Sequence, residues 1–259
     1  MTAIKHRVLI TGYGPFRQYK QNPSWLAVRT LHNTVIYTPN HGDSSSREPI
    51  HITSLEIPVV YSEVLDIIPG LHAAPPVLPS LALTNTNGNL TTQLAPPPPQ
   101  DGYTLIIHVG VAGPTELRVE LFGDKTGYDL PDHLGKFAPV VGERSPDPDK
   151  GEEGDEPVPV RGFGGEKYGM FPERLGVKVD VDTLLEDCAK EGKTLVTSTD
   201  AGHYLCDFIL YCSLAESKMA GRNTPVMFIH CPPVGRPLST EQVAEGLKSI
   251  VSNVCARLG

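Results

Sequence analysis

Two residues in the C-terminal half of the chain, Cys206 and His230, have the types and spacing needed for nucleophilic catalysis. Cys206 ends the stretch STDAGHYLC at 198–206, which joins a Thr- and Val-rich run to a helical pattern over about 207–219. A strand-to-helix turn presents its side chains at the carboxyl edge of a sheet, where open α/β proteins place their sites. Because a thiol at a helix N-terminus faces free backbone N–H groups, we expect its thiolate to be favoured. His230 closes the apolar run 225–229, so the two residues fit a nucleophile and its general base.

The same two residues also fit a purely structural interpretation. Free cysteine is among the most buried residue types and is usually inert core. A histidine at the end of a strand usually only satisfies local hydrogen bonds. Residue types alone therefore leave both interpretations open, and the rest of the chain must decide.

Composition narrows the class of protein. The 259 residues are 39% hydrophobic, which is enough for one well-buried α/β domain. The net charge of -8, without a Lys- or Arg-rich block, disfavours nucleic acid and anionic membrane as partners. No apolar run reaches the length of a bilayer span, and the first residues lack the apolar core of a signal peptide. The 5 cysteines are odd in number and never spaced C-x-x-C, which disfavours a disulfide framework or a zinc ribbon. We therefore expect a soluble cytoplasmic protein.

Apolar runs and helical patterns alternate along the chain without an internal repeat. The runs predict strands at 6–11, 51–57, 103–109, 116–122, 194–197 and 225–229, and helices beginning near 22, 61, 180, 207 and 239. Such alternation predicts an α/β fold: a single-domain three-layer α/β/α arrangement with a mixed, mostly parallel sheet.

Two segments interrupt this pattern, at about 69–102 and 135–169. The first is rich in Pro, Asn, Thr and Leu, and the second in Gly, Pro and charge. Neither keeps a period of 2 or 3.6, so we expect exposed loop insertions that bury little apolar surface. The acidic run at 152–156 is more typical of a solvated loop than of a metal site.

A glycine-bearing turn follows the first predicted strand. Its sequence, GYGPF at 12–16, matches a dinucleotide loop only in part, because the third glycine is missing and Pro15 removes a backbone donor. Tyr13 and Phe16 instead fit either one wall of a pocket or simple core packing.

Four stretches, in the same order, resemble the pyroglutamyl peptidase type I (pyrrolidone carboxyl peptidase) family of cysteine peptidases. They are 8–16 followed by NPSW at 22–25, LEIPVV at 55–60, DAGHYLCD at 200–207 and FIHCP at 228–232. The third is similar to the family's nucleophile turn, with Asp200 and Asp207 in place of its first Ser and last Asn. Two long insertions mark the chain as a divergent member.

The resemblance implies roles for particular residues. Cys206 becomes the nucleophile and His230 its base. The family's third residue is a Glu after a strand ending H-V-G, which Glu120 matches best, with Glu116 as the runner-up. By the same resemblance, four residues line the pocket for a flat, uncharged ring: Tyr13, Phe16, Tyr204 and Leu205. The family's basic residue after that Glu, and its Arg before I-P-D, are missing here.

The function implied is that of a cysteine exopeptidase acting through a Cys-His-Glu triad. It would remove an N-terminal pyroglutamyl residue from peptides and would need no metal or organic cofactor. Its expected partners are peptides that begin with pyroglutamate. Two alternatives remain: another amide hydrolase on the same scaffold, or a non-catalytic binding relative.

Overall fold

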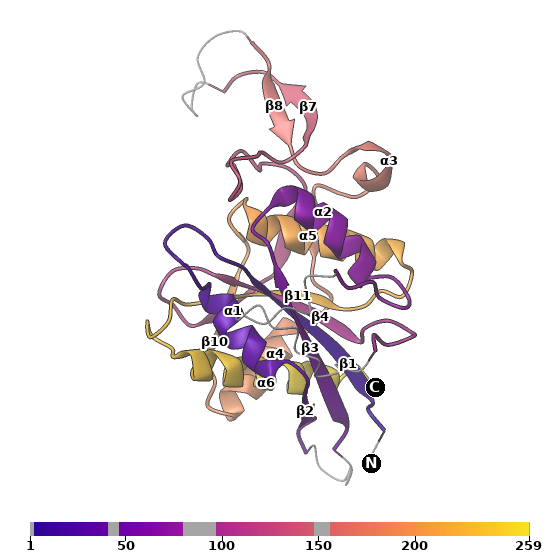
Figure 1. Cartoon of the computed structure of the whole chain (residues 1–259), viewed down its shortest axis with the longest axis vertical. Helices are drawn as coiled ribbons and strands as arrows, with labels where there is room; N and C mark the ends of the chain where they lie inside the picture. The colour runs from indigo at the N-terminus through magenta and orange to yellow at the C-terminus, as the bar shows by residue number, and fades with distance from the viewer. Residues whose placement is uncertain (1–2, 41–46, 80–96, 148–155, 259) are drawn as a thin grey trace.

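The computed structural model describes residues 3–40, 47–79, 97–147 and 156–258, and its centre is a seven-stranded sheet of order β10-β5-β11-β4-β1-β3-β2 (Figure 1). The strands are β1 (His6–Tyr13), β2 (Thr34–Tyr37), β3 (Pro49–Ile57), β4 (Leu105–Val111), β5 (Leu117–Glu120), β10 (Leu195–Ser198) and β11 (Val226–Cys231). Strands β2 and β5 run antiparallel to β3 and β11, whereas the pairs β10–β5, β11–β4, β4–β1 and β1–β3 are parallel. The prediction of a mixed, mostly parallel sheet is confirmed.

Helices cover both faces of this sheet. Helices α2 (Tyr61–Leu71) and α5 (Leu205–Met219) lie together on one face, and α1 (Pro23–Val28), α4 (Val181–Lys190) and α6 (Thr240–Cys255) lie on the other (Figure 1). Because strand side chains alternate between faces, β11 sends Phe228 into the first core and Met227 and Ile229 into the second. The three-layer prediction is confirmed.

Short polar signals begin the helices. The side chain of Asn22 accepts the Ser24 N–H at the start of α1, and Asp180 does the same for Thr183 in α4. A capping box between Ser239 and Gln242 opens α6. Each cap satisfies a backbone N–H that the first turn would otherwise leave without a partner.

The segment 69–102 begins inside a helix rather than in a loop, because α2 continues through Pro69 to Leu71. The segment 135–169 is also more structured than expected. It contains a hairpin of β7 (Val140–Arg144) and β8 (Val158–Arg161), followed by the short helix α3 (Gly165–Tyr168).

The second segment also contributes to the core, which corrects the expectation that it buries little apolar surface. Phe163 and Tyr168 are 2% and 7% exposed, and the ring of Phe163 stacks on Phe208 of α5 at 4.2 Å. Aromatic residues without regular spacing can still anchor a loop to the core. Because these residues follow no helical or strand period, the sequence pattern did not reveal their burial. Residues 80–96 and 148–155, including most of the acidic run, lie outside the described ranges.

Two further short strands form a small sheet of their own, apart from the seven-stranded sheet. They are β6 (Phe122–Asp124) and β9 (Arg174–Gly176), which pair antiparallel. The sequence patterns predicted neither β9 nor β2. Within the described ranges, no helix is both long and apolar enough to cross a bilayer.

Candidate active site

Cys206 lies in the first turn of α5, at the end of the turn that leaves β10. Gly202 and His203 in that turn have φ of 97° and 43°, in the left-handed region that reverses the chain within few residues. Tyr204 is the N-cap residue, and its side chain makes no capping hydrogen bond. The first backbone N–H groups of α5 therefore point out of the helix beside the thiol.

His230 and Glu120 meet across neighbouring strands. Strand β11 runs antiparallel to β5, with Phe228 opposite Glu120 and His230 opposite Arg118. Nδ1 of His230 lies 2.6 Å from Oε1 of Glu120, and both residues are buried. Nε of Arg118 donates to the same Oε1 at 2.8 Å.

This contact assigns the tautomer of the imidazole. Nη2 of Arg118 also lies 3.3 Å from Nδ1 of His230, but a guanidinium can only donate. The shorter contact decides: Nδ1 carries a proton and donates it to Glu120, which leaves Nε2 to accept.

The environment keeps Glu120 ionised. Burial acts to raise the pKa of this carboxyl, but its interactions with His230, Ser198 and Arg118 outweigh it. The net pKa lies below its ordinary value. Glu116 lies before β5 and does not take part in this contact. Of the two candidates, the structure brings Glu120 to His230.

Cys206 lies over Gly110 of β4. A Cβ atom added at Gly110 would lie 2.8 Å from Sγ of Cys206 and 2.7 Å from Cζ of Phe228. Gly110 is also the residue that pairs in register with His230 on β11. The absence of a side chain at Gly110 therefore makes room for the thiol on the face of the sheet that carries the imidazole.

The expectation that the thiolate of Cys206 is favoured is wrong for the free protein. Burial raises the pKa of the thiol, and the charges of Glu120 and Asp207 raise it further, against a smaller opposing effect of Arg118. Position at a helix N-terminus does not overcome these effects. The resting residue is a thiol, and it needs a base to lose its proton.

Of the four predicted pocket residues, Phe16 and Tyr204 line a hollow at this edge. The rings of Phe16 and Tyr204 lie 5.6 Å apart and border a hollow of about 330 Å³. Tyr13 and Leu205 are buried beneath it, where the Tyr13 hydroxyl donates to the carbonyl of Leu205 at 2.5 Å. Cys206 is not among the lining residues; Tyr204 connects it to the hollow.

The hollow is less apolar than expected. Besides Phe16 and Tyr204 it is lined by Arg17, Leu130, Pro131, Asp132 and His133. The carboxylate of Asp132 already accepts backbone N–H groups from Tyr61, Leu134 and Lys136. Its charge is thus largely satisfied by the protein itself.

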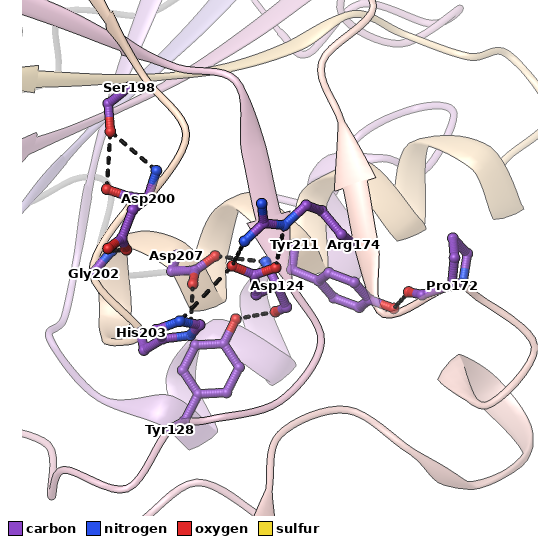
Figure 2. Close-up of polar contacts among 10 residues, drawn as sticks. All are labelled: Asp124, Tyr128, Pro172, Arg174, Ser198, Asp200, Gly202, His203, Asp207 and Tyr211. Carbon is purple, nitrogen blue, oxygen red and sulfur yellow. Dashed lines mark hydrogen bonds and ion pairs between the residues drawn. The ribbon is translucent and has the colours of Figure 1, made fainter.

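A polar cluster around Asp207, the residue after Cys206, was not predicted from the sequence (Figure 2). Oδ1 of Asp207 accepts the backbone N–H of Asp124 at 2.8 Å, and Nδ1 of His203 lies 3.4 Å from Oδ2 of Asp207. The guanidinium of Arg174 donates two hydrogen bonds to the carboxylate of Asp124, at 2.6 and 2.9 Å. The i, i+4 spacing of His203 and Asp207 was the one signal in the sequence that could have revealed it.

This cluster contains residue types that bind metals. Ligand atoms of Asp124, His203 and Asp207 lie within 4.8 Å of one another. Both carboxylate oxygens of Asp124, however, already bind the guanidinium of Arg174. Arg174 supplies a cation to Asp124, so this part of the cluster fits an ion pair better than a metal site.

Comparisons with known proteins show what the whole chain is similar to. Human pyroglutamyl-peptidase 1 is 29% identical over 257 residues, covering 98% of this chain and 92% of the human protein. The chain is similar to the type I pyroglutamyl peptidases over nearly its whole length. Mouse pyroglutamyl-peptidase 1 is 28% identical over the same coverage. The crystal structure of Bacillus amyloliquefaciens pyroglutamyl peptidase I superposes with a TM-score of 0.65 at 19% identity, covering 98% of both chains. No protein-family model matches. The resemblance to the pyroglutamyl peptidases is confirmed, and the solved structure shows the same fold.

Proposed function

We propose that this protein is a cysteine exopeptidase that removes an N-terminal pyroglutamyl residue from peptides. The observation that carries the proposal is the buried 2.6 Å contact between His230 and Glu120 beside Cys206. It lies in a chain that is similar, nearly from end to end, to human pyroglutamyl-peptidase 1. The 5 free cysteines fit a reducing compartment, and we propose a cytoplasmic location on that basis.

The reaction begins with proton transfer from Cys206 to Nε2 of His230. The sulfur attacks the carbonyl carbon that joins the lactam ring to the next residue, and the carbonyl oxygen takes the negative charge. When the C–N bond breaks, the imidazolium gives its proton to the leaving amine, and a thioester remains on Cys206. Water then attacks the thioester while His230 takes its proton. Pyroglutamate leaves, and the proton returns to the sulfur.

Glu120 and the first turn of α5 support these steps. The carboxylate of Glu120 holds the imidazole in the tautomer that accepts at Nε2 and stabilises the imidazolium that forms. Because the pKa of Glu120 is lowered, it stays ionised throughout. Backbone N–H groups near Cys206 supply donors for the developing oxyanion.

Selectivity follows from the charge of the substrate's first residue. A pyroglutamyl residue carries no ammonium group, since its amine is tied into the lactam. The hollow beside Phe16 and Tyr204 offers an aromatic wall, and its carboxylate, Asp132, is already satisfied by backbone donors. A free ammonium would lose hydration there without gaining an unoccupied partner.

The test is release of a fluorophore from its pyroglutamyl amide. Cys206→Ala should abolish turnover, whereas Cys188→Ala and Cys255→Ala, in buried positions away from the site, should retain it. We expect the glutaminyl, glutamyl and prolyl amides to react at least about 100-fold more slowly. Equal rates on the glutaminyl and pyroglutamyl amides would point to another amide hydrolase. No turnover on any amide, with an unreactive Cys206, would point to a binding relative.

A further inference from the structure

Asp207 directly follows Cys206, and its side chain has an unusual position for a carboxylate. The residue is 0% exposed. Oδ1 accepts the N–H of Asp124, but Oδ2 accepts no hydrogen bond from the described residues and lies 3.4 Å from Nδ1 of His203 (Figure 2). A buried carboxylate oxygen without a donor is costly when charged.

The hydrogen bond to Asp124 joins two parts of the site. Asp207 is in the first turn of α5, while Asp124 ends β6, the strand that directly follows Glu120. The approach is close, because a Cβ added at Gly123 of β6 would lie 2.7 Å from the backbone nitrogen of Tyr211 in α5. Asp207 therefore fixes the nucleophile's helix turn against the chain segment that carries the third residue of the proposed triad.

The surroundings do not balance a charge on Asp207. The ionisable groups that face it are Asp124 on β6, Arg174 on β9, His203 in the preceding turn, Tyr128 in the loop after β6, Tyr61 on α2 and Cys206 on α5 itself. The one guanidinium is bound to Asp124 through both oxygens. The imidazole of His203, 47% exposed, is the remaining basic group in contact with Asp207, and it carries a charge only when it is protonated.

We propose that Asp207 is a positioning residue whose protonation state modulates Cys206: neutral Asp207 holds the turn without adding a negative charge beside the thiol, and charged Asp207 further opposes ionisation of the thiol. The two groups are neighbours in the chain, with Asp207 buried and Cys206 half-buried, so water screens them less than it would on an open surface. The effect on Cys206 stands without a substrate; its consequence for turnover rests on the proposed peptidase function.

The change falls in the neutral range. Burial raises the pKa of Asp207 to about 7, and the charge of Asp124 also raises it, against the Asp124 N–H and the charge of His203. Below pH 7 Asp207 carries a proton and does not repel a thiolate. Above pH 7 its charge adds to the effects that keep Cys206 protonated, so the reactivity of Cys206 should rise less steeply with pH than that of an ordinary thiol.

The test is the pH profile of Cys206 alkylation by iodoacetamide, followed by peptide mass spectrometry, in the wild type and in Asp207→Asn. The asparagine keeps an oxygen that accepts the Asp124 N–H but cannot ionise. We expect equal rates near pH 6 and alkylation about 3- to 10-fold faster in Asp207→Asn near pH 8.5. The matched control is Asp200→Asn, which removes an exposed carboxylate from the same turn and should follow the wild type.

A ratio between Asp207→Asn and wild type that stays constant with pH would overturn the proposal and leave Asp207 a merely structural residue. If Asp207→Asn does not fold, His203→Gln provides the second test. Because the charge of His203 lowers the pKa of Asp207, its removal should move the bend in the profile to higher pH. An unmoved bend would contradict the proposal. Alkylation uses no substrate, so its outcome is separate from peptidase activity; the peptidase proposal fails instead if complete alkylation of Cys206 leaves amide turnover intact.

Discussion

Two histidine–carboxylate pairs flank Cys206, and they are built in opposite ways. His230 and Glu120 come from different strands, far apart in the sequence, and their atoms are 2.6 Å apart. His203 and Asp207 are one helical turn apart at the start of α5, and their atoms are 3.4 Å apart. The first pair is a hydrogen bond inside the core, and the second is a looser contact whose imidazole is 47% exposed.

The two carboxylates differ because of their second partners. Arg118 donates to the same oxygen of Glu120 as His230 does, and the pKa of Glu120 is lowered despite burial. Near Asp207 the guanidinium of Arg174 is bound to Asp124 instead, and burial raises the pKa of Asp207 to about 7. Residue types alone do not tell an orienting carboxylate from a titrating one; the donors around each carboxylate do. Oε1 of Glu120 has both His230 and Arg118 as partners, whereas Oδ1 of Asp207 accepts one backbone N–H, and the second oxygen of each accepts no hydrogen bond from the described residues.

The strongest way to test this contrast is Glu120→Gln. The amide can still contact His230 but cannot carry the charge that stabilises the imidazolium. We expect kcat/KM on a pyroglutamyl amide to fall by at least about 10-fold, with a smaller change in thermal stability. The measurement is steady-state kinetics together with a melting curve.

Glu116→Gln is the matched control, since Glu116 lies outside the contact with His230. It should keep wild-type kinetics. A full loss in Glu116→Gln and none in Glu120→Gln would contradict the geometry that distinguishes the two pairs.

Gly110→Ala tests whether turnover through His230 and Glu120 depends on the present position of the Cys206 thiol. The new methyl group would stand 2.8 Å from Sγ of Cys206 and 2.7 Å from Phe228, so both must shift. We expect about a 10-fold loss of kcat/KM, with a stability loss of about 1–3 kcal/mol from overpacking. Gly113→Ala, at an exposed position with open space, should change neither kinetics nor melting.

Much of this arrangement could be predicted from the sequence. The alternation of apolar runs and helical patterns predicted the sheet and its layers. Cys206 stood out at a strand-to-helix turn, and His230 at the end of an apolar run. The pairing with Glu120 was predicted from family resemblance and not from spacing. It depends on β5 lying antiparallel to β11, a register that no local pattern specifies.

The second pair could not be predicted in the same way. His203 and Asp207 are close in sequence, but their role depends on Asp124 and Arg174, which β6 and β9 bring to them. Neither the short strand β9 nor the bidentate contact of Arg174 leaves a periodic signal. The raised pKa of Cys206 also depends on burial, which position at a helix N-terminus does not reveal.

Stability measured against pH tests the second pair directly. The pKa of Asp207 is about 7 in the folded protein and 3.8 is its ordinary value, so the unfolded chain ionises first as pH rises. The wild type should therefore lose stability relative to Asp207→Asn between about pH 4 and 7 and hold that deficit above pH 7. We expect melting temperatures to differ little at pH 4 and by on the order of 5 °C at pH 8. A difference independent of pH would show that the charge of Asp207 is already compensated.

The smallest expected effect concerns the hollow that Phe16 and Tyr204 line. Phe16 packs against Tyr204, with ring centroids 5.6 Å apart, and lines the hollow, but it has no ionisable group and makes no hydrogen bond to either histidine–carboxylate pair. Phe16→Ala removes one aromatic wall and should raise KM for a pyroglutamyl amide by about 3- to 10-fold, because truncating an apolar side chain that lines a pocket costs about 1 kcal/mol or slightly more. The alkylation rate of Cys206 and its dependence on pH should stay as in the wild type, since the charges around the thiol are unchanged. Leu130→Ala, at another part of the same hollow, is the matched comparison and should raise KM less, because Leu130 is 51% exposed. If Phe16→Ala instead lowers kcat and slows alkylation, the hollow and the nucleophile are not separate features. The view that the hollow binds the substrate while the two histidine–carboxylate pairs set the charge around Cys206 would then be wrong.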